Sequence, residues 1–273
     1  MTHIQRWGAF LLTLWGTLQA TGLLHAQGPG LILAHRGGLA EFEENTMEGF
    51  RACYEKGIRG FETDIRMTQD GELVILHDDK LDRTYNATGS VENKPAAELR
   101  NITSRKHGHP VLFLQELLAY FADKPGVYIE LEMKTSNKKL YPDSRLDEYC
   151  RKLFAAANAH QPQGATYVFT SFDERPIRII HALDPKAPLS LIASKPCSSE
   201  FIQRAKELGA DRIACQLNGT SRSAVREAQK AGLLVNGWPG HSLQDYYLAL
   251  GLGVDIHCTD MPVALLAWQE RWK

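Results

Sequence analysis

The sequence lacks an excess of charge of either sign. Its 31 lysine and arginine residues almost balance 32 aspartate and glutamate residues, and the formal net charge of the 273-residue chain is −1. A surface that binds a polyanion is normally strongly basic, so this balance argues against nucleic acid as a partner. An anion would have to be bound locally, by a few cations at one site. The remaining composition, 44% hydrophobic, is typical of a globular protein with one sizeable core.

Cysteine is scarce, odd in number and scattered. The five residues are Cys53, Cys150, Cys197, Cys215 and Cys258. They form no Cys-x-x-Cys pair and lie in no histidine-rich spacing, which argues against a zinc site. Two of them, Cys215 and Cys258, lie in strand-like runs, and we expect both to be buried as small apolar side chains. One disulfide would be compatible with an exported protein, but the spacing identifies no pair.

One apolar run stands apart, at the N terminus. Residues 1–26 combine Arg6, the mostly apolar stretch WGAFLLTLWGTLQATGLL and a small residue, Ala26, before Gln27. This pattern predicts a cleavable secretory signal, and therefore an exported protein, periplasmic or secreted, whose domain spans 27–273. The alternative is an uncleaved membrane anchor, because Leu24 is not the small residue preferred at that position. No cysteine lies at the junction, which argues against a lipoprotein.

Over the rest of the chain, short β-branched apolar runs alternate with longer amphipathic stretches, as in βα units around a parallel sheet. We expect strands near 31–36, 60–66, 127–133, 167–171, 189–193, 211–216, 233–238 and 254–259. We expect helices over 45–56, 112–122, 144–159, 174–182, 198–208, 221–231 and 243–250. Eight strands in a chain of this length predict a single (β/α)8 TIM barrel. The alternative, an open doubly wound sheet, would normally have a GxGxxG turn after its first strand, and none is present.

The strand-like run 73–79 (LVILHDD) does not fit this alternation. It follows the strand at 60–66 too closely for a parallel crossover, which needs a dozen or more residues. The intervening MTQDGE contains Asp70-Gly71, a hairpin signal. We therefore expect 73–77 to fold back antiparallel as an extra strand at the barrel mouth. With Gln69-Asp70 as the centre of the turn, Glu62 would pair with about His77. The polar, turn-rich stretch 80–110 is too short for a second domain and is expected to cover part of the mouth.

Carboxylates alternate along two of the expected strands. Glu62 and Asp64 face one side of the second strand, and Glu132 shares a face with Lys134 on the third, with Glu130 lying deeper. Active sites of such barrels lie at the carboxyl ends of the strands. Buried carboxylates repel one another unless a cation compensates, and oxygen ligands favour magnesium or calcium. We expect Glu62, Asp64 and Glu132 to bind one divalent cation, Mg²⁺ or Ca²⁺.

Other strand ends carry polar or aromatic residues of compatible types. The first strand ends in His35-Arg36, the hairpin strand in His77-Asp78, and the seventh strand in Trp238. Singly, each has an ordinary interpretation, such as a turn for His77-Asp78 or a core aromatic for Trp238. Together they support phosphoryl transfer at a phosphodiester, with a metal and cationic side chains on the phosphate and two histidines as general acid and base. Asp78 either orients His77 or, as its neighbour, points away.

Seven motifs resemble, in order, those of the glycerophosphodiester phosphodiesterase family: AHRG, EENT, GFETDIRMTQDGELVILHDDKLDRTYNATG, IELEMK, TSFD, VNGWPG and GVDIHCTDMP. They cover nearly the whole chain after residue 30. The resemblance implies a TIM barrel and metal-dependent hydrolysis of glycerophosphodiesters to glycerol 3-phosphate and an alcohol. It implies a small-molecule substrate and no obligate membrane partner.

The resemblance also implies a role for each matching residue. His35 and His77 would be the acid/base pair; Arg36 and Lys134 would contact the phosphate; Glu62, Asp64 and Glu132 would bind the metal; Trp238 would line the substrate pocket; and Glu44 and Asn45 would support the mouth. Two departures lie near the pocket rim: LFLQE at 112–116 replaces the usual Pro-Thr-Leu-Glu-Glu, and PGH at 239–241 replaces the Thr-Val-Asn that usually follows the tryptophan. They concern substrate preference more than the reaction.

Two alternatives are open. A lysophospholipase D or a phosphoinositide phosphodiesterase on the same barrel would be favoured by an exposed apolar rim. An exported binding barrel without catalysis would have lost at least one histidine or carboxylate of the set, and none is missing. Since function has to be argued from the site, and the set is complete, an active enzyme is favoured.

Overall fold

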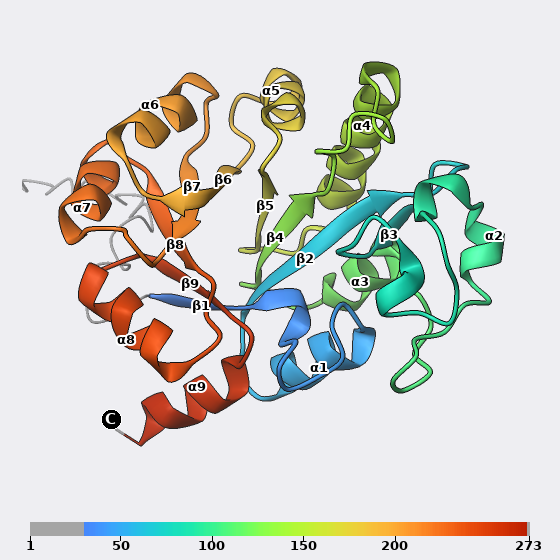
Figure 1. Cartoon of the computed structure of the whole chain (residues 1–273), viewed down its shortest axis with the longest axis horizontal. Helices are drawn as coiled ribbons and strands as arrows, with labels where there is room; N and C mark the ends of the chain where they lie inside the picture. The colour runs from blue at the N-terminus through green and yellow to red at the C-terminus, as the bar shows by residue number, and fades with distance from the viewer. Residues whose placement is uncertain (1–29, 272–273) are drawn as a thin grey trace, which may run out of the picture.

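The computed structural model describes residues 30–271, and its centre is a closed barrel (Figure 1). Its eight parallel strands are β1 (Leu31–Ala34), β2 (Gly60–Met67), β4 (Tyr128–Met133), β5 (Thr166–Ser171), β6 (Leu189–Pro196), β7 (Arg212–Gln216), β8 (Leu234–Trp238) and β9 (Ile256–Thr259). Strand β1 pairs with both β9 and β2, which closes the sheet on itself. The predicted TIM barrel is therefore confirmed, whereas the predicted signal at 1–26 lies outside the described residues.

Helices cover the outside of the barrel. They are α1 (Met47–Glu55), α3 (Leu114–Phe121), α4 (Asp143–His160), α5 (Glu174–Leu183), α6 (Ser199–Glu207), α7 (Arg222–Lys230), α8 (Leu243–Leu252) and α9 (Pro262–Glu270). Thr46, Ser198, Ser221 and Ser242 begin four of them by accepting a hydrogen bond from a backbone N–H of the first turn. The main apolar core lies between these helices and the strands. Within residues 30–271 no helix has the length and apolar character needed to cross a membrane.

The extra strand, β3 (Leu73–Ile75), pairs antiparallel with β2 as predicted. Its register differs by one residue from the prediction. Ile65 lies opposite Ile75, so that the register, extended to Glu62, reaches Asp78 rather than His77. The reason is the length of the turn: the backbone N–H of Thr68 bonds to the carbonyl of Glu72, which leaves three residues in the loop. His77 consequently lies beyond the end of β3.

Residues 80–110 form a packed annex beside β3 (Figure 1). The annex contains the 3-10 turns η2 (Leu81–Arg83) and η3 (Val91–Asn93) and the helix α2 (Ala96–Leu99). The apolar side chains of the annex pack against residues that precede and follow it, and together they form a small core: Leu81, Tyr85, Val91, Ala96 and Leu99 of the annex with Val74, Leu76, Val111 and Phe113. The buried Arg66 of β2 ties the annex to the barrel, with bonds of 2.9 Å to Glu92 and 2.7 Å to Asp79. These contacts fix the loop that carries His77.

All five cysteines are buried and free. The expectation that Cys215 and Cys258 are buried apolar side chains is confirmed. They contribute to packing inside and around the barrel, as small hydrophobic groups usually do.

Candidate active site

A cavity of about 280 Å³ opens at the carboxyl end of the barrel strands. It brings together seven of the residues that the sequence singles out, namely His35, Arg36, Glu62, His77, Glu132, Lys134 and Trp238. The other four, Glu44, Asn45, Asp64 and Asp78, lie behind these and bond to them. All eleven therefore belong to one connected set of side chains at the predicted end of the barrel.

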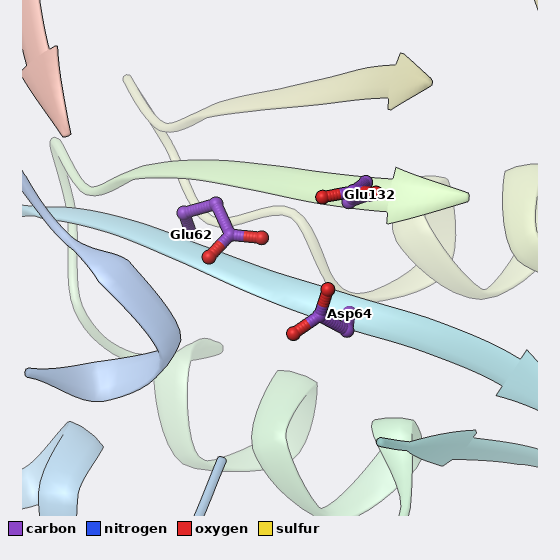
Figure 2. A group of neighbouring side chains, drawn as sticks. All are labelled: Glu62, Asp64 and Glu132. Atoms are coloured by element: carbon purple, nitrogen blue, oxygen red, sulfur yellow. The ribbon is translucent and has the colours of Figure 1, made fainter. Parts of the chain in front are cut away.

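Three buried carboxylates face one another across β2 and β4. The parallel register sets Asp64 beside Glu132 and Glu62 beside Glu130. Oxygens of Glu62, Asp64 and Glu132 all lie within 4.8 Å of one another, and Figure 2 shows the two β2 carboxylates approaching that of β4. Within residues 30–271, Glu62 Oε1 is buried and accepts no hydrogen bond. The hard oxygen donors and the unpaired oxygen fit a Mg²⁺ or Ca²⁺ ion.

The surroundings shift the pKa values of Glu62 and Asp64 in opposite directions. Burial, followed by the charges of Asp64 and Glu132, raises the pKa of Glu62 well above its ordinary value. Burial also acts to raise the pKa of Asp64, but the charges of Lys134, His77 and Arg36 outweigh it and lower that pKa. Ionising all three carboxylates at this separation has a high electrostatic cost unless a positive charge compensates their repulsion. A cation bound between them would remove this penalty.

Glu130 lies outside the three-carboxylate group, deeper in the barrel. Its carboxyl group accepts hydrogen bonds from Tyr128 Oη, at 3.1 Å, and from Asn236 Nδ2, at 3.1 Å to each oxygen. Burial raises the pKa of Glu130 to about 7. The residue is thus held by neutral donors, and its placement agrees with the expectation that it is the weaker metal ligand.

Two cations flank the three carboxylates. Lys134 Nζ lies 2.7 Å from Glu132 Oε1 and 3.5 Å from Asp64 Oδ1. Arg36 Nε lies 3.5 Å from Asp64 Oδ2, and the Arg36 backbone N–H donates to Glu62 Oε2 at 3.1 Å. Burial acts to lower the pKa of Lys134 and of Arg36, but the carboxylates around them raise both. Both side chains are therefore charged and border the cavity.

Each residue of the Glu44-Asn45-Thr46 turn makes a different contact. Glu44 pairs with Arg36 at 3.3 Å, and Asn45 Nδ2 donates to Asp64 Oδ2 at 2.9 Å. Thr46 caps helix α1. Arg36 and Asn45 both have positive φ, 50° and 57°, which is uncommon for residues other than glycine and is often found at functional sites. The turn thus holds the cation Arg36 and the carboxylate Asp64 in place.

His35 is oriented by a residue that the sequence did not point to. Its Nδ1 lies 2.5 Å from Asp260 Oδ1, at the end of β9, and its Nε2 lies 3.8 Å from Glu62 Oε2. His241 bonds through its own Nδ1 to the other oxygen of Asp260. Burial acts to raise the pKa of Asp260, but the bonds from both histidines lower it. A carboxylate bound to Nδ1 leaves Nε2 of His35 as the nitrogen available to the cavity.

His77 is oriented by its neighbour Asp78, which points toward it: Nδ1 and Oδ1 are 2.8 Å apart. Arg83 of η2, also missed from the sequence, binds Asp78 at 2.6 Å and 3.1 Å and Glu44 at 2.7 Å through two nitrogens. Burial acts to raise the pKa of Asp78, but the bonds from Arg83 and His77 lower it to about 2. The signals available in the sequence were DRT at 82–84 for Arg83 and the CTDMP motif for Asp260.

Trp238, at the end of β8, forms one wall of the cavity. Its ring meets that of Phe172 edge to face, with centroids 5.8 Å apart. Phe172 is 38% exposed, and the only other exposed large hydrophobic side chain in the described part of the chain, Tyr247, lies on α8. The rim therefore carries one exposed aromatic ring, not an extended apolar surface.

Comparison with known proteins agrees with this geometry. The model of the glycerophosphoryl diester phosphodiesterase family matches residues 35–264. A glycerophosphodiester phosphodiesterase of Bacillus subtilis is 25% identical, over 85% of this chain and 84% of that protein. One from Caldanaerobacter subterraneus is also 25% identical, over 86% of this chain and 96% of the relative.

Solved structures share the barrel. An Oleispira antarctica phosphodiesterase in complex with the product sn-glycerol-3-phosphate superposes with a TM-score of 0.78, at 22% identity, over 87% of this chain and 95% of that one. A glycerophosphodiester phosphodiesterase from Thermotoga maritima has a TM-score of 0.70 at 20% identity, over 89% and 99% of the two chains. At these identities the likeness concerns the fold.

Proposed function

The chain belongs to the glycerophosphoryl diester phosphodiesterase family, and from this we propose that it hydrolyses glycerophosphodiesters to glycerol 3-phosphate and an alcohol. We further propose that the reaction depends on one divalent cation and on His35 and His77 as general acid and base. One observation carries the proposal: two histidines, each bound through Nδ1 to its own aspartate, line one cavity with two cations and the three-carboxylate group. The product complex of the Oleispira antarctica relative supports a small polyol phosphate as the product.

Each residue has a role that its position supports. Glu62, Asp64 and Glu132 would hold the cation, which when bound supplies Lewis-acid stabilisation of the charge that develops on the phosphoryl group. Arg36 and Lys134 would bind the non-bridging oxygens of the phosphate. One histidine would accept a proton from the attacking oxygen while the other donates one to the leaving oxygen.

The test is a panel of glycerophosphodiesters with choline, ethanolamine, inositol or glycerol as the second alcohol. We expect release of glycerol 3-phosphate, loss of activity with chelator, and recovery with Mg²⁺ or Ca²⁺. The variant Glu132→Gln should lose activity, and Glu207→Gln, at an exposed position on α6, should not.

Other outcomes would point elsewhere. Activity that persists in chelator would remove the metal from the proposal. Cleavage of lysophospholipids without cleavage of glycerophosphodiesters would favour a lysophospholipase D, and binding without turnover would favour a non-catalytic barrel. The small apolar area at the rim does not favour the first of these, and the complete set of side chains does not favour the second.

We also propose that the protein is exported, on the strength of the N-terminal segment alone. Cleavage is expected after Ala26. N-terminal sequencing of the protein recovered from outside the cytoplasm should then begin at Gln27, and a chain that keeps residues 1–26 would indicate a membrane anchor.

A further inference from the structure

Two of the five cysteines, Cys197 and Cys215, are brought together by the barrel. Cys215 lies in β7, and Cys197 directly follows β6, which pairs with β7 up to Pro196 and Gln216. The two thiols are hydrogen-bonded to each other, and the backbone N–H of Cys197 also donates to the sulfur of Cys215. The spacing of the cysteines in the sequence identifies no pair, whereas the pairing of β6 with β7 does.

Thr220, in the loop after β7, holds the two cysteines in this arrangement. Its Oγ1 accepts from the backbone N–H of Cys197 at 2.9 Å and donates to the carbonyl of Gln216 at 2.5 Å. The same Oγ1 lies 4.0 Å from the sulfur of Cys215. One hydroxyl group thus ties the backbone of one cysteine to the strand of the other, which limits how far the two sulfurs can separate.

The two thiols differ in reactivity. The hydrogen bond from Cys215 lowers the pKa of Cys197 although burial acts to raise it, whereas the same bond and burial raise the pKa of Cys215. Cys197 is the one cysteine of the five whose pKa is lowered. The residues on either side of it, Pro196 and Ser198, are exposed. Since the thiolate is the form that attacks a disulfide, Cys197 would react first and Cys215 second.

A metal site is the alternative use of two adjacent thiols. A structural zinc ion is held by four cysteine or histidine ligands. Within residues 30–271, the one group of three or more candidate metal ligands is the three-carboxylate group of the active-site cavity. The two cysteines belong instead to the main apolar core, between the strands and the helices. The chemistry that this pair supports is therefore a covalent bond between the two sulfurs.

We propose that Cys197 and Cys215 form an intramolecular disulfide, by exchange with an external disulfide, and that the bond fixes the end of β6 to β7. Disulfides form in the oxidising compartments that exported proteins reach, so this inference agrees with the proposed export and does not depend on the proposed hydrolysis. The sulfur of Cys197 attacks one sulfur of the external disulfide and releases the other as a thiol. Cys215 then attacks the sulfur of Cys197 and releases the second thiol, so that the external disulfide takes up both electrons and both protons. The bond lies behind the cavity wall, because Gln216 of β7 pairs with Trp238 of β8.

The test is the number of free thiols in the full chain after refolding in a mixture of reduced and oxidised glutathione. Alkylation of the denatured protein should modify three of the five cysteines, because two are used in the bond, and all five after reduction with dithiothreitol. Mass spectrometry of a proteolytic digest should find Cys197 linked to Cys215. In Cys215→Ser, Cys197 should stop at the mixed disulfide with glutathione, whereas the control Cys150→Ser should keep the bond. Five free thiols in the refolded protein, or bonds that join other cysteines, would overturn the proposal.

The midpoint of thermal unfolding gives a second measurement. A bond that closes a loop of this length should raise the midpoint of the oxidised protein above that of the reduced protein by about 5 °C or more. The difference should disappear in Cys197→Ser and Cys215→Ser and remain in Cys150→Ser. An oxidised protein that carries the bond and unfolds at no higher temperature would overturn its role in fixing β6 to β7. Neither measurement uses hydrolysis, so an inactive enzyme would leave the disulfide standing, and a missing disulfide would leave the proposed function standing.

Discussion

The two histidines of the site are held in different ways. His35 bonds to Asp260, a carboxylate 225 residues away whose side chain is 7% exposed. His77 bonds to the next residue, Asp78, which is 29% exposed and bound in turn by Arg83. The first arrangement exists only because β9 closes the barrel against β1, whereas the second is local to one loop. The position of His35 therefore depends on closure of the whole barrel. The position of His77 depends on a local network at the surface, in which Asp78 is bound by both His77 and Arg83.

Although the two histidines are held differently, we expect both to contribute strongly to catalysis. His35→Ala and His77→Ala should each lower kcat by about 10²-fold or more, because proton transfer at both the attacking and the leaving oxygen needs a positioned group. Steady-state hydrolysis of glycerophosphocholine measures the effect. The exposed His107→Ala serves as the control and should behave as wild type. Near-wild-type turnover by either variant would remove that histidine from the mechanism.

Replacing the two aspartates should lower kcat by different amounts, because only one of them is buried. Asp260→Asn should lower kcat by about 10- to 100-fold, because it removes a buried charge that orients His35 and also receives His241. Asp78→Asn should cost only about two- to fivefold, since it is partly exposed and its charge is screened by water. The control is Asp147→Asn, whose side chain is 47% exposed on α4. Equal losses of kcat in the two variants would show that burial of the aspartate does not determine how much it contributes to orienting its histidine.

The strand pattern was enough to predict the barrel and the carboxylates. Glu62 and Asp64 alternate with the two-residue period of a strand, and parallel neighbours bring their carboxyl ends to one edge, so Glu132 could be placed beside them. The predicted register of β3 differed by one residue because a two-residue turn was centred on Gln69-Asp70, whereas the loop has three residues, 69–71. The turn type depends on the backbone of Gly71, whose φ is 88°, and not on residue identity alone.

The positioning residues could not be predicted in the same way. Nothing local connects Asp260 with His35, because their contact is created by closure of the barrel. Arg83 lies in a polar segment where a charged residue is ordinary, and its role appears only when Asp78 and Glu44 are seen to flank it. The small core of the annex was also missed, since its apolar residues are isolated and follow neither a helical nor a strand period.

Replacing Arg83 should lower activity less than replacing either histidine. Arg83→Ala should lower kcat/KM by about two- to fivefold through both parameters, because Arg83 steadies Asp78 on one side and Glu44, which holds Arg36, on the other. Arg83→Lys should recover only part of the loss, since one ammonium group cannot reproduce the paired bonds of a guanidinium. The matched control is Arg178→Ala, an exposed arginine on α5.

The contact between Arg83 and Asp78 can also be tested with a double variant. In the Arg83→Ala, Asp78→Asn double variant, the loss in kcat should be smaller than the product of the two single losses, because both changes act on the network around His77. Losses that multiply in full would show that Arg83 acts through Glu44 and not through Asp78.

The smallest expected effect is on stability in acid. The bonds from Arg83 and His77 lower the pKa of Asp78 from 3.8 to about 2. Since the pKa is lower in the folded state, the stabilisation is present above about pH 4 and is lost as the pH falls toward 2. The difference in unfolding free energy between wild type and Asp78→Asn should therefore shrink on acidification, by less than about 1 kcal/mol, because the pair is partly exposed and screened. Urea titrations at about pH 5 and about pH 2.5, with Asp147→Asn as the reference, measure it. A difference that grows in acid would mean that Asp78 is not held as an ion in the folded protein.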